Sequence, residues 1–292
     1  MKYHFIPYNF GGIEKQDFKK ARVVVLPVPY DSTASFISGS KMGPKSIIYA
    51  SRFLDELFDP KGKGNLLGIK DTEIFTLDEI EINKNSAREA IESIEEAVYN
   101  EIIKYNKIPL VLGGEHSITL GVVRALRKKH KNFSILHFDA HTDLIDELEN
   151  TKYSHGSVMR RVYDLKIPFV QIGIRNLNSE VKEFVKRKKI KSYLMPEVPS
   201  ANEVLDSLTE KVYISFDLDA FDPSILPAVG TPEPGGLLWQ QVIDIIKAVS
   251  KKKRIIGCDV VELCPIPGSV QSEFTAAKLA YHLIVNANDS QK

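Results

Sequence analysis

The stretch Phe133-Ser-Ile-Leu-His-Phe138, followed at once by Asp139-Ala-His-Thr-Asp143, decides the fold. A nearly continuous apolar run of this length is typical of a strand covered on both faces, as in a parallel sheet. Acidic and imidazole side chains begin where the apolar run ends. Open parallel sheets bind their ligands at the carboxyl ends of the strands. The stretch therefore predicts a buried parallel strand that carries polar groups to a binding site.

The same alternation of apolar and amphipathic runs continues along the chain. Apolar, β-branched runs predict further strands at Val23–Val28, Pro109–Leu112, Phe169–Ile174, Val212–Phe216 and Arg254–Val261. Helical spacing predicts helices at Ser86–Tyr105, Ser117–His130, Ser179–Lys188, Trp239–Lys252 and Ser272–Val285, and Ser86 with Glu89 forms a potential capping box. We expect one α/β domain over residues 1–292, with a mostly parallel sheet and helices on both of its faces.

Composition and charge restrict the class of protein. The chain has 292 residues, of which 43% are hydrophobic, and its formal net charge of +1 gives no general footprint for nucleic acid. Basic runs at 127–131, 186–191 and 251–254 each end a predicted helix, and we interpret them as solvated helix ends. No signal-peptide run or membrane span stands out, and two cysteines make no disulfide framework. We expect a cytoplasmic protein without nucleic-acid or membrane partners.

Six candidate metal ligands follow three of the predicted strands: His116, Asp139, His141, Asp143, Asp217 and Asp219. Positions i and i+2 of a strand end point to the same side, so each Asp139/His141 and Asp217/Asp219 pair can face one cleft. Single Asp residues after strands are often turn residues, but three such clusters favour a site. Four carboxylates and two imidazoles fit two divalent ions with shared carboxylates, and such ligands suit manganese. Two ions about 3.5–4 Å apart can activate a water held between them.

The motifs around these residues resemble those of the ureohydrolase family of arginases and agmatinases. They are Gly113-Gly-Glu-His116, Asp139-Ala-His-Thr-Asp143, Ser215-Phe-Asp-Leu-Asp-Ala-Phe-Asp-Pro223, Val25-Leu-Pro-Val-Pro-Tyr-Asp31, Gly39-Ser-Lys-Met-Gly-Pro44, Gly230-Thr-Pro-Glu-Pro-Gly-Gly236 and Asp259-Val-Val-Glu262. The resemblance implies a three-layer α/β/α fold, a trimer or hexamer of identical chains, and two Mn²⁺ ions, with other divalent ions as alternatives. It assigns His116, Asp139, Asp143 and Asp217 to one ion, and Asp139, His141, Asp217 and Asp219 to the other.

The resemblance also implies the chemistry, which is hydrolysis of a guanidinium group to urea and an amine by a metal-bridging hydroxide. Asp143, beside the hydroxide, would take its proton and pass it to the departing amine. Glu262, which follows the last predicted strand, would accept hydrogen bonds from the guanidinium group. His155, in Tyr153-Ser-His-Gly-Ser157, matches the family's proton-relay histidine.

The expected substrate is a small guanidino compound, agmatine, which would give putrescine and urea. Arginases typically have Asn at the position of Ile145 and Asp near that of Asn178, and a pocket without these groups should bind a zwitterionic tail poorly. Alternatives are aminopropylagmatine, arginine or guanidinobutyrate as substrate, or a formiminoglutamase-like amidine hydrolase that releases formamide. An acidic substrate of this last kind would need a basic pocket residue, and Arg175 is the only obvious one near a strand end.

Other polar residues near the motifs have no assigned role as ligands. They are His4, His130, His137 and His282, and strand alternation is expected to turn His137 away from the neighbours of Asp139 or to place it behind them. Glu115 either accepts a hydrogen bond from a ligand imidazole or packs, and Glu233 either lines the pocket or stabilises its own loop. A metal-binding protein without activity is disfavoured, because no ligand of the set is missing.

Overall fold

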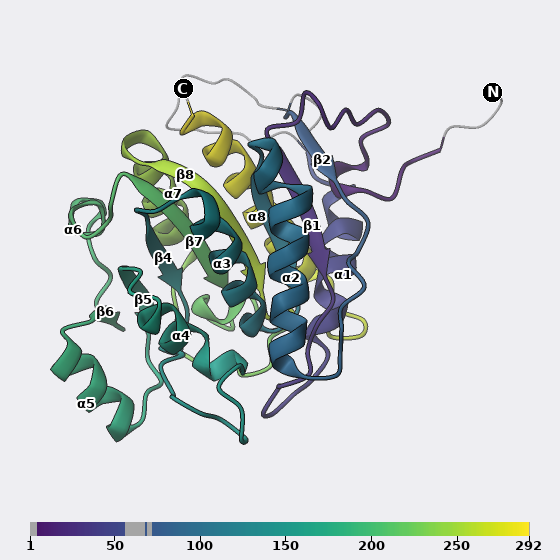
Figure 1. Cartoon of the computed structure of the whole chain (residues 1–292). Coiled ribbons are helices and arrows are strands. Elements are labelled where there is room, and N and C mark those ends of the chain that lie inside the picture. The colour runs from purple at the N-terminus through teal and green to yellow at the C-terminus, as the bar shows by residue number, and fades with distance from the viewer. Residues whose placement is uncertain (1–4, 56–67, 69–71, 292) are drawn as a thin grey trace.

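An eight-stranded sheet forms the centre of the molecule (Figure 1), and the computed structural model describes residues 5–55, 68 and 72–291. All of its strand pairs are parallel, and the strand order is β2-β1-β3-β8-β7-β4-β5-β6. The strands are β1 (Val23–Val28), β2 (Ile74–Thr76), β3 (Ile108–Gly113), β4 (Ser134–Phe138), β5 (Phe169–Ile174), β6 (Lys191–Leu194), β7 (Lys211–Asp217) and β8 (Arg254–Val261). The predicted α/β class is thereby confirmed.

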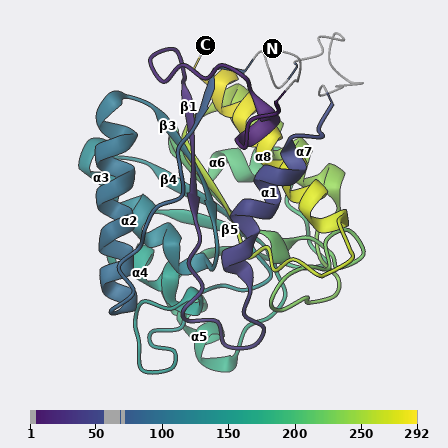
Figure 2. The ribbon, with the colours of Figure 1, turned by 90° about the vertical axis from the view of Figure 1, so that its right-hand side faces the viewer.

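Helices cover both faces of the sheet, so the molecule has three layers (Figure 2). One face carries α2 (Ala87–Glu101), α3 (Thr119–Lys129), α4 (Val158–Asp164) and α5 (Ser179–Lys188). The other carries α1 (Gly43–Ser51), α6 (Ala201–Asp206), α7 (Trp239–Lys252) and α8 (Gln271–Asp289). No helix among the described residues has the length and apolar character that a membrane crossing requires.

Strand alternation divides the apolar core into two parts, one on each face of the sheet. In β1, Val23 and Val25 pack with the α1, α7 and α8 side, whereas Val24 and Val28 pack with the α2 and α3 side. Every residue of β1 is buried, which explains why its sequence is apolar without alternation. Each Val or Ile side chain buried in this way contributes roughly 1.5–3 kcal/mol through removal of its surface from water.

The elements that the sequence did not predict are short. β2 and β6 are edge strands of three and four residues, and α1, α4 and α6 have nine, seven and six residues. Half of the capping box predicted for α2 is present, because the side chain of Ser86 accepts a hydrogen bond of 3.1 Å from the backbone N–H of Glu89, whereas the Glu89 carboxylate accepts from the hydroxyl of Ser86 and not from its backbone. The helix predicted from Ser117 begins as a 3-10 turn, His116–Ile118, before α3 starts at Thr119.

The strand order places the carboxyl ends of β3, β8, β7 and β4 next to one another. His116 follows β3, Glu262 follows β8, Asp217 ends β7 and Asp139 follows β4. The chain after β3 passes very close to the loop after β1, since a Cβ atom on Gly114 would lie 2.0 Å from the carbonyl oxygen of Tyr30. Glycine is therefore required at Gly114 to bring His116 to this edge of the sheet.

Candidate metal centre and active site

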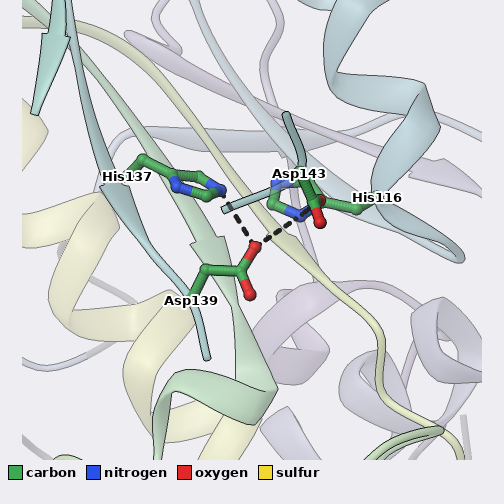
Figure 3. Close-up of side chains that lie close together, drawn as sticks. All are labelled: His116, His137, Asp139 and Asp143. Atoms are coloured by element: carbon green, nitrogen blue, oxygen red, sulfur yellow. Dashed lines mark ion pairs between the residues drawn. The ribbon is translucent and has the colours of Figure 1, made fainter. Parts of the chain in front are cut away.

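One imidazole nitrogen lies at the middle of the predicted ligand group. Nδ1 of His116 is 3.2 Å from Oδ2 of Asp139, 3.1 Å from Oδ2 of Asp143 and 3.2 Å from Oδ2 of Asp217. All four side chains are buried. Figure 3 shows His116, Asp139 and Asp143 directed toward one another, His116 from the chain after β3 and the two aspartates from the chain after β4. These are the four residues that the resemblance to the ureohydrolases assigned to the first ion.

A second group shares a residue with the first. Nδ1 of His141 is 2.9 Å from Oδ2 of Asp219 and 3.5 Å from Oδ1 of Asp139. The two oxygens of Asp139 thus face two different imidazoles, His116 and His141, which is the position that a bridging carboxylate requires. Asp217 lies against the first group through Oδ2, and its Oδ1 accepts a hydrogen bond of 2.9 Å from the backbone N–H of Asp219. The structure therefore brings all six predicted ligands together.

Two polar atoms at the centre of the cluster lack hydrogen-bond partners among the described residues, as expected if a cation binds between them. Nδ1 of His116 and Oδ2 of Asp139 are buried and have no hydrogen-bond partner in the described part of the chain, although they lie 3.2 Å apart. Buried polar atoms normally have partners. A nitrogen surrounded by three carboxylate oxygens, none in hydrogen-bonding alignment, is the arrangement expected of ligands around a metal ion. Two groups of potential ligands, one around His116 and one around His141, share Asp139.

Crowding of the carboxylates shifts their pKa values in a way that a cation would relieve. Burial raises the pKa of Asp217 well above its usual value, and the charges of Asp219 and Asp139 raise it further. Burial and the charge of Asp139 also raise the pKa of Asp219. Burial opposes ionisation of Asp139, but the nearby imidazoles of His116, His137 and His141 outweigh it and hold its pKa well below the usual range. Divalent ions bound among these side chains would offset the repulsion between the carboxylates and take the places of protons.

The carboxylates also raise the pKa values of two histidines in the cluster. Burial disfavours charge on His116, yet the surrounding carboxylates outweigh burial and raise the pKa of its imidazole well above the usual value. The same balance raises the pKa of His141 to about 12, through Asp139 and Asp219. Metal binding at this edge of the sheet would therefore release protons from imidazole nitrogens as well as from carboxylates.

A hydrogen-bonded chain behind His116 fixes which of its nitrogens can bind metal. Oγ of Ser215 donates to Oδ1 of Asp259 over 3.0 Å, so Ser215 is left to accept from Nε2 of His116, 2.9 Å away. The proton of a neutral His116 then resides on Nε2, and Nδ1 presents its lone pair to the carboxylate cluster. Asp259 is held in turn by Thr119, over 2.7 Å, and by the hydroxyl of Tyr213. Polar residues inside the apolar runs of β7 and β8 were the available signal for this chain of contacts, and the sequence reasoning did not use it.

His137 contradicts the expectation that it points away from Asp139. Its Nε2 lies 3.0 Å from Oδ2 of Asp139, and the two side chains face each other in Figure 3. The reason is the alternation itself, because positions 137 and 139 are two residues apart at the end of one strand and share a side. His137 is therefore part of the cluster that surrounds Asp139, and its ring also stacks on that of His116 with centroids 5.1 Å apart.

Two of the predicted catalytic residues have a backbone conformation that is rare for their type. Asp143 has φ of 52° and Glu262 has φ of 68°, in the left-handed region. This conformation costs a residue other than glycine roughly 1–2 kcal/mol, and such strain clusters at functional sites. Oε1 of Glu262 accepts a hydrogen bond of 2.6 Å from the backbone N–H of His116. Burial, followed by the charge of Glu115, raises the pKa of Glu262 well above its usual value.

The third predicted catalytic residue, His155, contacts the loop after β1 and not the ligand cluster. The hydroxyl of Thr33 accepts a hydrogen bond of 3.1 Å from the backbone N–H of His155 and lies 3.4 Å from its Nδ1, while Nε2 is 3.2 Å from Oγ of Ser35. The buried carboxylate of Glu115 accepts from both the N–H and the hydroxyl of Thr33, each over 2.6 Å. Glu115 thus fixes the loop that carries His155 and contacts no ligand imidazole.

A hollow of about 250 Å³ opens above these residues. Its base is formed by His116, His141, Asp143, Asp217, Asp219 and Glu262, the partly exposed His155 lies at its rim, and its walls include the apolar side chains of Phe36, Ile37, Ile145, Leu148, Leu177 and Val181. Among the described residues that line it there is no Lys or Arg. The hollow is therefore acidic at its base and apolar toward its mouth.

Two residues considered for the pocket have other roles. The guanidinium group of Arg175 donates to backbone carbonyls, among them those of Asp219 and Glu233 at 2.7 Å each. Oε1 of Glu233 accepts a hydrogen bond of 2.5 Å from the side chain of Asn176. Arg175 therefore ties the 233–234 loop to the sheet and is not available to meet a substrate carboxylate. Asn178 does line the hollow, and its side chain caps α5.

Comparison with known proteins agrees along nearly the whole chain. The Arginase family model matches residues 21–285. An N(1)-aminopropylagmatine ureohydrolase of Thermus thermophilus is 38% identical over 94% of this chain and 92% of its own length, and an agmatinase of Bacillus cereus is 32% identical over 92% of each. The crystal structure of the agmatine ureohydrolase of Thermoplasma volcanium superposes with a TM-score of 0.86 at 32% identity, over 98% of this chain and 96% of that one.

Proposed function

The chain belongs to the arginase family of guanidino hydrolases, and we propose that its substrate is a guanidino compound whose other end is an amine rather than a carboxylate. One such compound is agmatine, whose hydrolysis consumes one water and gives urea and putrescine. The observation that supports this proposal is the lining of the hollow, with carboxylates at its base and no Lys or Arg among its described residues.

The lining argues against substrates with an acidic tail. Arginine, guanidinobutyrate and formiminoglutamate each carry a carboxylate that would lose its hydration on entering the hollow. A desolvated carboxylate needs a cation or several donors in return. Arg175, the one basic residue considered for this purpose, is already surrounded by backbone carbonyls. An alkyl chain, in contrast, gains from contact with the apolar walls.

Glu262 is the residue that we assign to orienting the guanidinium group. Its carboxylate lines the base of the hollow, beside the metal cluster. A carboxylate pairs well with the planar N–H donors of a guanidinium group. The hydrogen bond of 2.6 Å from the backbone of His116 fixes Glu262 relative to the nearest ligand, so the guanidinium carbon would be held at a set position above the cluster.

His116, Asp139, His141, Asp143, Asp217 and Asp219 would hold two divalent ions, which we propose to be Mn²⁺. Ions held there would supply Lewis-acid chemistry, lowering the pKa of a shared water and polarising the group that it attacks. Asp143 lies in the base of the hollow with an oxygen 3.1 Å from His116, and we assign it the transfer of a proton from the attacking water to the departing amine. His155, at the rim and partly exposed, would exchange that proton with solvent.

N(1)-Aminopropylagmatine is a second candidate substrate. Relatives with this name reach 38% identity, against 32% for one named agmatinase. The apolar walls extend to Phe36 at the mouth, whose side chain is 74% exposed, so a longer alkylamine tail would still find apolar contact where it leaves the hollow.

A panel of substrates with purified, manganese-loaded protein tests the proposal. Agmatine and N(1)-aminopropylagmatine should release urea, with kcat/KM at least about a hundredfold above that for arginine or guanidinobutyrate, because unpaired buried charge costs a few kcal/mol. Formiminoglutamate should release no formamide. Preference for any substrate with an acidic tail would refute the proposed specificity, and absence of urea from every compound would refute the proposed activity.

A further inference from the structure

A second hollow, rich in cations, lies at the amino ends of the strands, at the opposite edge of the sheet from the metal cluster. Its volume is about 660 Å³. Arg22 immediately precedes β1, Lys107 precedes β3, Arg254 begins β8 and Lys211 begins β7, and all four line the hollow. These strands are consecutive neighbours in the sheet. The fold therefore gathers four cations from distant parts of the sequence along one edge.

The register of the strands places these cations close together. Lys211 and Arg254 are direct register partners in the β7–β8 pair. In the β1–β3 pair, Val23 is opposite Ile108, so the preceding residues, Arg22 and Lys107, are also neighbours. The last turn of α3 adds Lys129 and the following His130 to the lining. Two of the basic runs of the sequence, 127–131 and 251–254, thus meet at one hollow.

Acidic side chains do not balance these cations. No Asp or Glu occurs among the described residues that line the hollow. Within the same part of the chain, the only ion pair formed by a lining cation joins Arg22 to Glu73, over 3.0 Å. Lys107 donates to the backbone carbonyls of Lys19 and Ala21, and Lys129 donates to that of Ile103. The positive charge of the hollow is therefore largely uncompensated.

Mutual repulsion of the cations is visible in their ionisation. Burial, followed by the charges of Lys211, Lys129 and Arg254, lowers the pKa of His130 to about 4. Burial and the charge of Arg254 also lower the pKa of Lys129. Cations at the end of a helix are commonly explained by the helix dipole. The helix dipole explains the position of Lys129 but not those of the four cations at the beginnings of strands, which are Arg22, Lys107, Lys211 and Arg254.

We propose that this basic hollow binds a small anion that carries two or more phosphoryl groups. Arg and Lys are the side chains that recognise phosphoryl oxygens, and a concave surface lined by one sign of charge concentrates ions of the other. Neighbouring strands are about 4.8 Å apart, so four strand ends extend over about 14 Å. One phosphate group can reach cations on adjacent strands only, whereas a chain of phosphoryl groups can reach across the row. A hollow of limited extent, in place of a long basic stripe, favours a small ligand over a nucleic acid.

Equilibrium dialysis of the manganese-loaded protein against inorganic tripolyphosphate tests this site. We expect one tripolyphosphate per chain, bound at least about tenfold more tightly than orthophosphate, since each added charge-assisted contact is worth about a factor of ten. Lys211→Gln and Arg254→Gln should each weaken binding by about tenfold. Lys251→Gln is the matched control, because it removes the same charge from an exposed position in α7 outside the hollow, and it should leave binding unchanged.

A second control separates this site from the metal centre, since polyphosphates also chelate manganese. Asp139→Asn should not change the retention of tripolyphosphate by the hollow, and loss of binding in that variant would place the anion at the metal instead and overturn the proposal. Equal binding by Lys211→Gln, Lys251→Gln and the parent chain would also overturn it. So would equal affinity for orthophosphate, or binding to duplex DNA as tight as to tripolyphosphate. Unchanged turnover of the guanidino substrate verifies that the Lys211 and Arg254 variants are folded.

Discussion

The side-chain amide of Gln171 donates a hydrogen bond of 3.0 Å to Nδ1 of His137. This nitrogen must then carry a lone pair, and the proton of the neutral ring is on Nε2, which lies 3.0 Å from Oδ2 of Asp139 without hydrogen-bond alignment. The orientation of Gln171 is itself fixed, because its Nε2 donates to the carbonyl of Thr142 over 2.8 Å and its Oε1 accepts from Ser192 over 2.8 Å. A neutral His137 therefore presents an N–H to the Asp139 cluster, and it has no free lone pair for a metal ion.

Replacement of His137 by Phe should weaken metal binding without abolishing it. Asp139 would lose the imidazole that lies 3.0 Å from its Oδ2, and removal of a group that supports a ligand typically lowers metal affinity by about 10–100-fold. Excess manganese should restore most of the turnover. Titration of metal-free protein with manganese, followed by atomic absorption, measures the change. A permanent loss of one ion per chain at saturating manganese would show instead that His137 is a ligand.

Replacement of Asp139 by Asn should remove an ion and nearly all activity. Asp139 faces both His116 and His141, so no other residue can take over both contacts. We expect turnover to fall by roughly four orders of magnitude, the scale seen when an essential catalytic group is removed. Metal content and urea release are the measurements. Two tightly bound ions in the variant would contradict the bridging position of Asp139.

Replacement of His155 by Ala should slow turnover while leaving metal content near that of the parent chain. His155 contacts Thr33 and Ser35 and none of the predicted ligands. Loss of a proton-transferring group costs about 10²–10⁴-fold in rate. Thr33→Val is a useful companion, because it removes the hydroxyl that joins Glu115 to His155 and should give part of the same loss. Large metal loss in His155→Ala would contradict its assignment.

Replacement of Phe36 by Lys tests the charge of the substrate tail. The side chain is at the mouth of the hollow and 74% exposed, so a cation there can be solvated without disturbing the fold. Repulsion should raise KM for agmatine by about three- to tenfold at low salt. Phe36→Gln controls for the lost apolar contact. Butylguanidine, which has no distal ammonium, should respond equally to both substitutions, and a charge effect on it would contradict the proposed orientation.

The ionisation of His130 predicts a pH-dependent contribution to stability. Its pKa falls from an ordinary 6.5 to about 4 on folding, because of burial and the charges of Lys211 on β7, Lys129 on α3 and Arg254 on β8. Between pH 4 and pH 6.5 the imidazole of His130 is protonated in the unfolded chain and neutral in the folded chain. The contribution of the neutral imidazole to the free energy of unfolding is therefore fully present above pH 6.5 and is lost as the pH falls toward 4. Urea unfolding of the parent and of His130→Asn at pH 7 and pH 5 should show a smaller pH effect in the variant. An NMR titration of His130 with a midpoint above 6 would contradict the prediction.

The central part of the fold could be predicted from the sequence because its signals are local and strong. The run 133–138 has no polar face, so it could only be a strand covered on both sides, and the acids after it had to lie at the carboxyl edge. Edge strands lack this signal. β6, for example, has one buried residue, Tyr193, and three that are exposed or half-buried, which is indistinguishable from a loop.

The metal ligands could also be predicted, because they directly follow strongly apolar strands. The residues that support the ligand side chains through hydrogen bonds could not. Ser215 and Asp259 are 44 positions apart, and their contact depends on the pairing of β7 with β8, which only the tertiary structure reveals. The same holds for Gln171 and His137, on β5 and β4. His137 differs from these, since the two-residue period of its own strand already pointed to Asp139 and the prediction misapplied it.

Because every strand runs in the same direction, the sheet also has an electrical polarity. β7 begins with Lys211 and ends with Asp217, so about 20 Å of strand separates a basic rim from an acidic one in a chain whose formal net charge is only +1. Divalent ions that bind at the acidic rim neutralise its negative charge and leave the positive charge of the basic rim unchanged. The metal-loaded molecule would then have its excess positive charge at the amino ends of the strands. A diffusing anion would be attracted to that face, which is the one farthest from the metal centre.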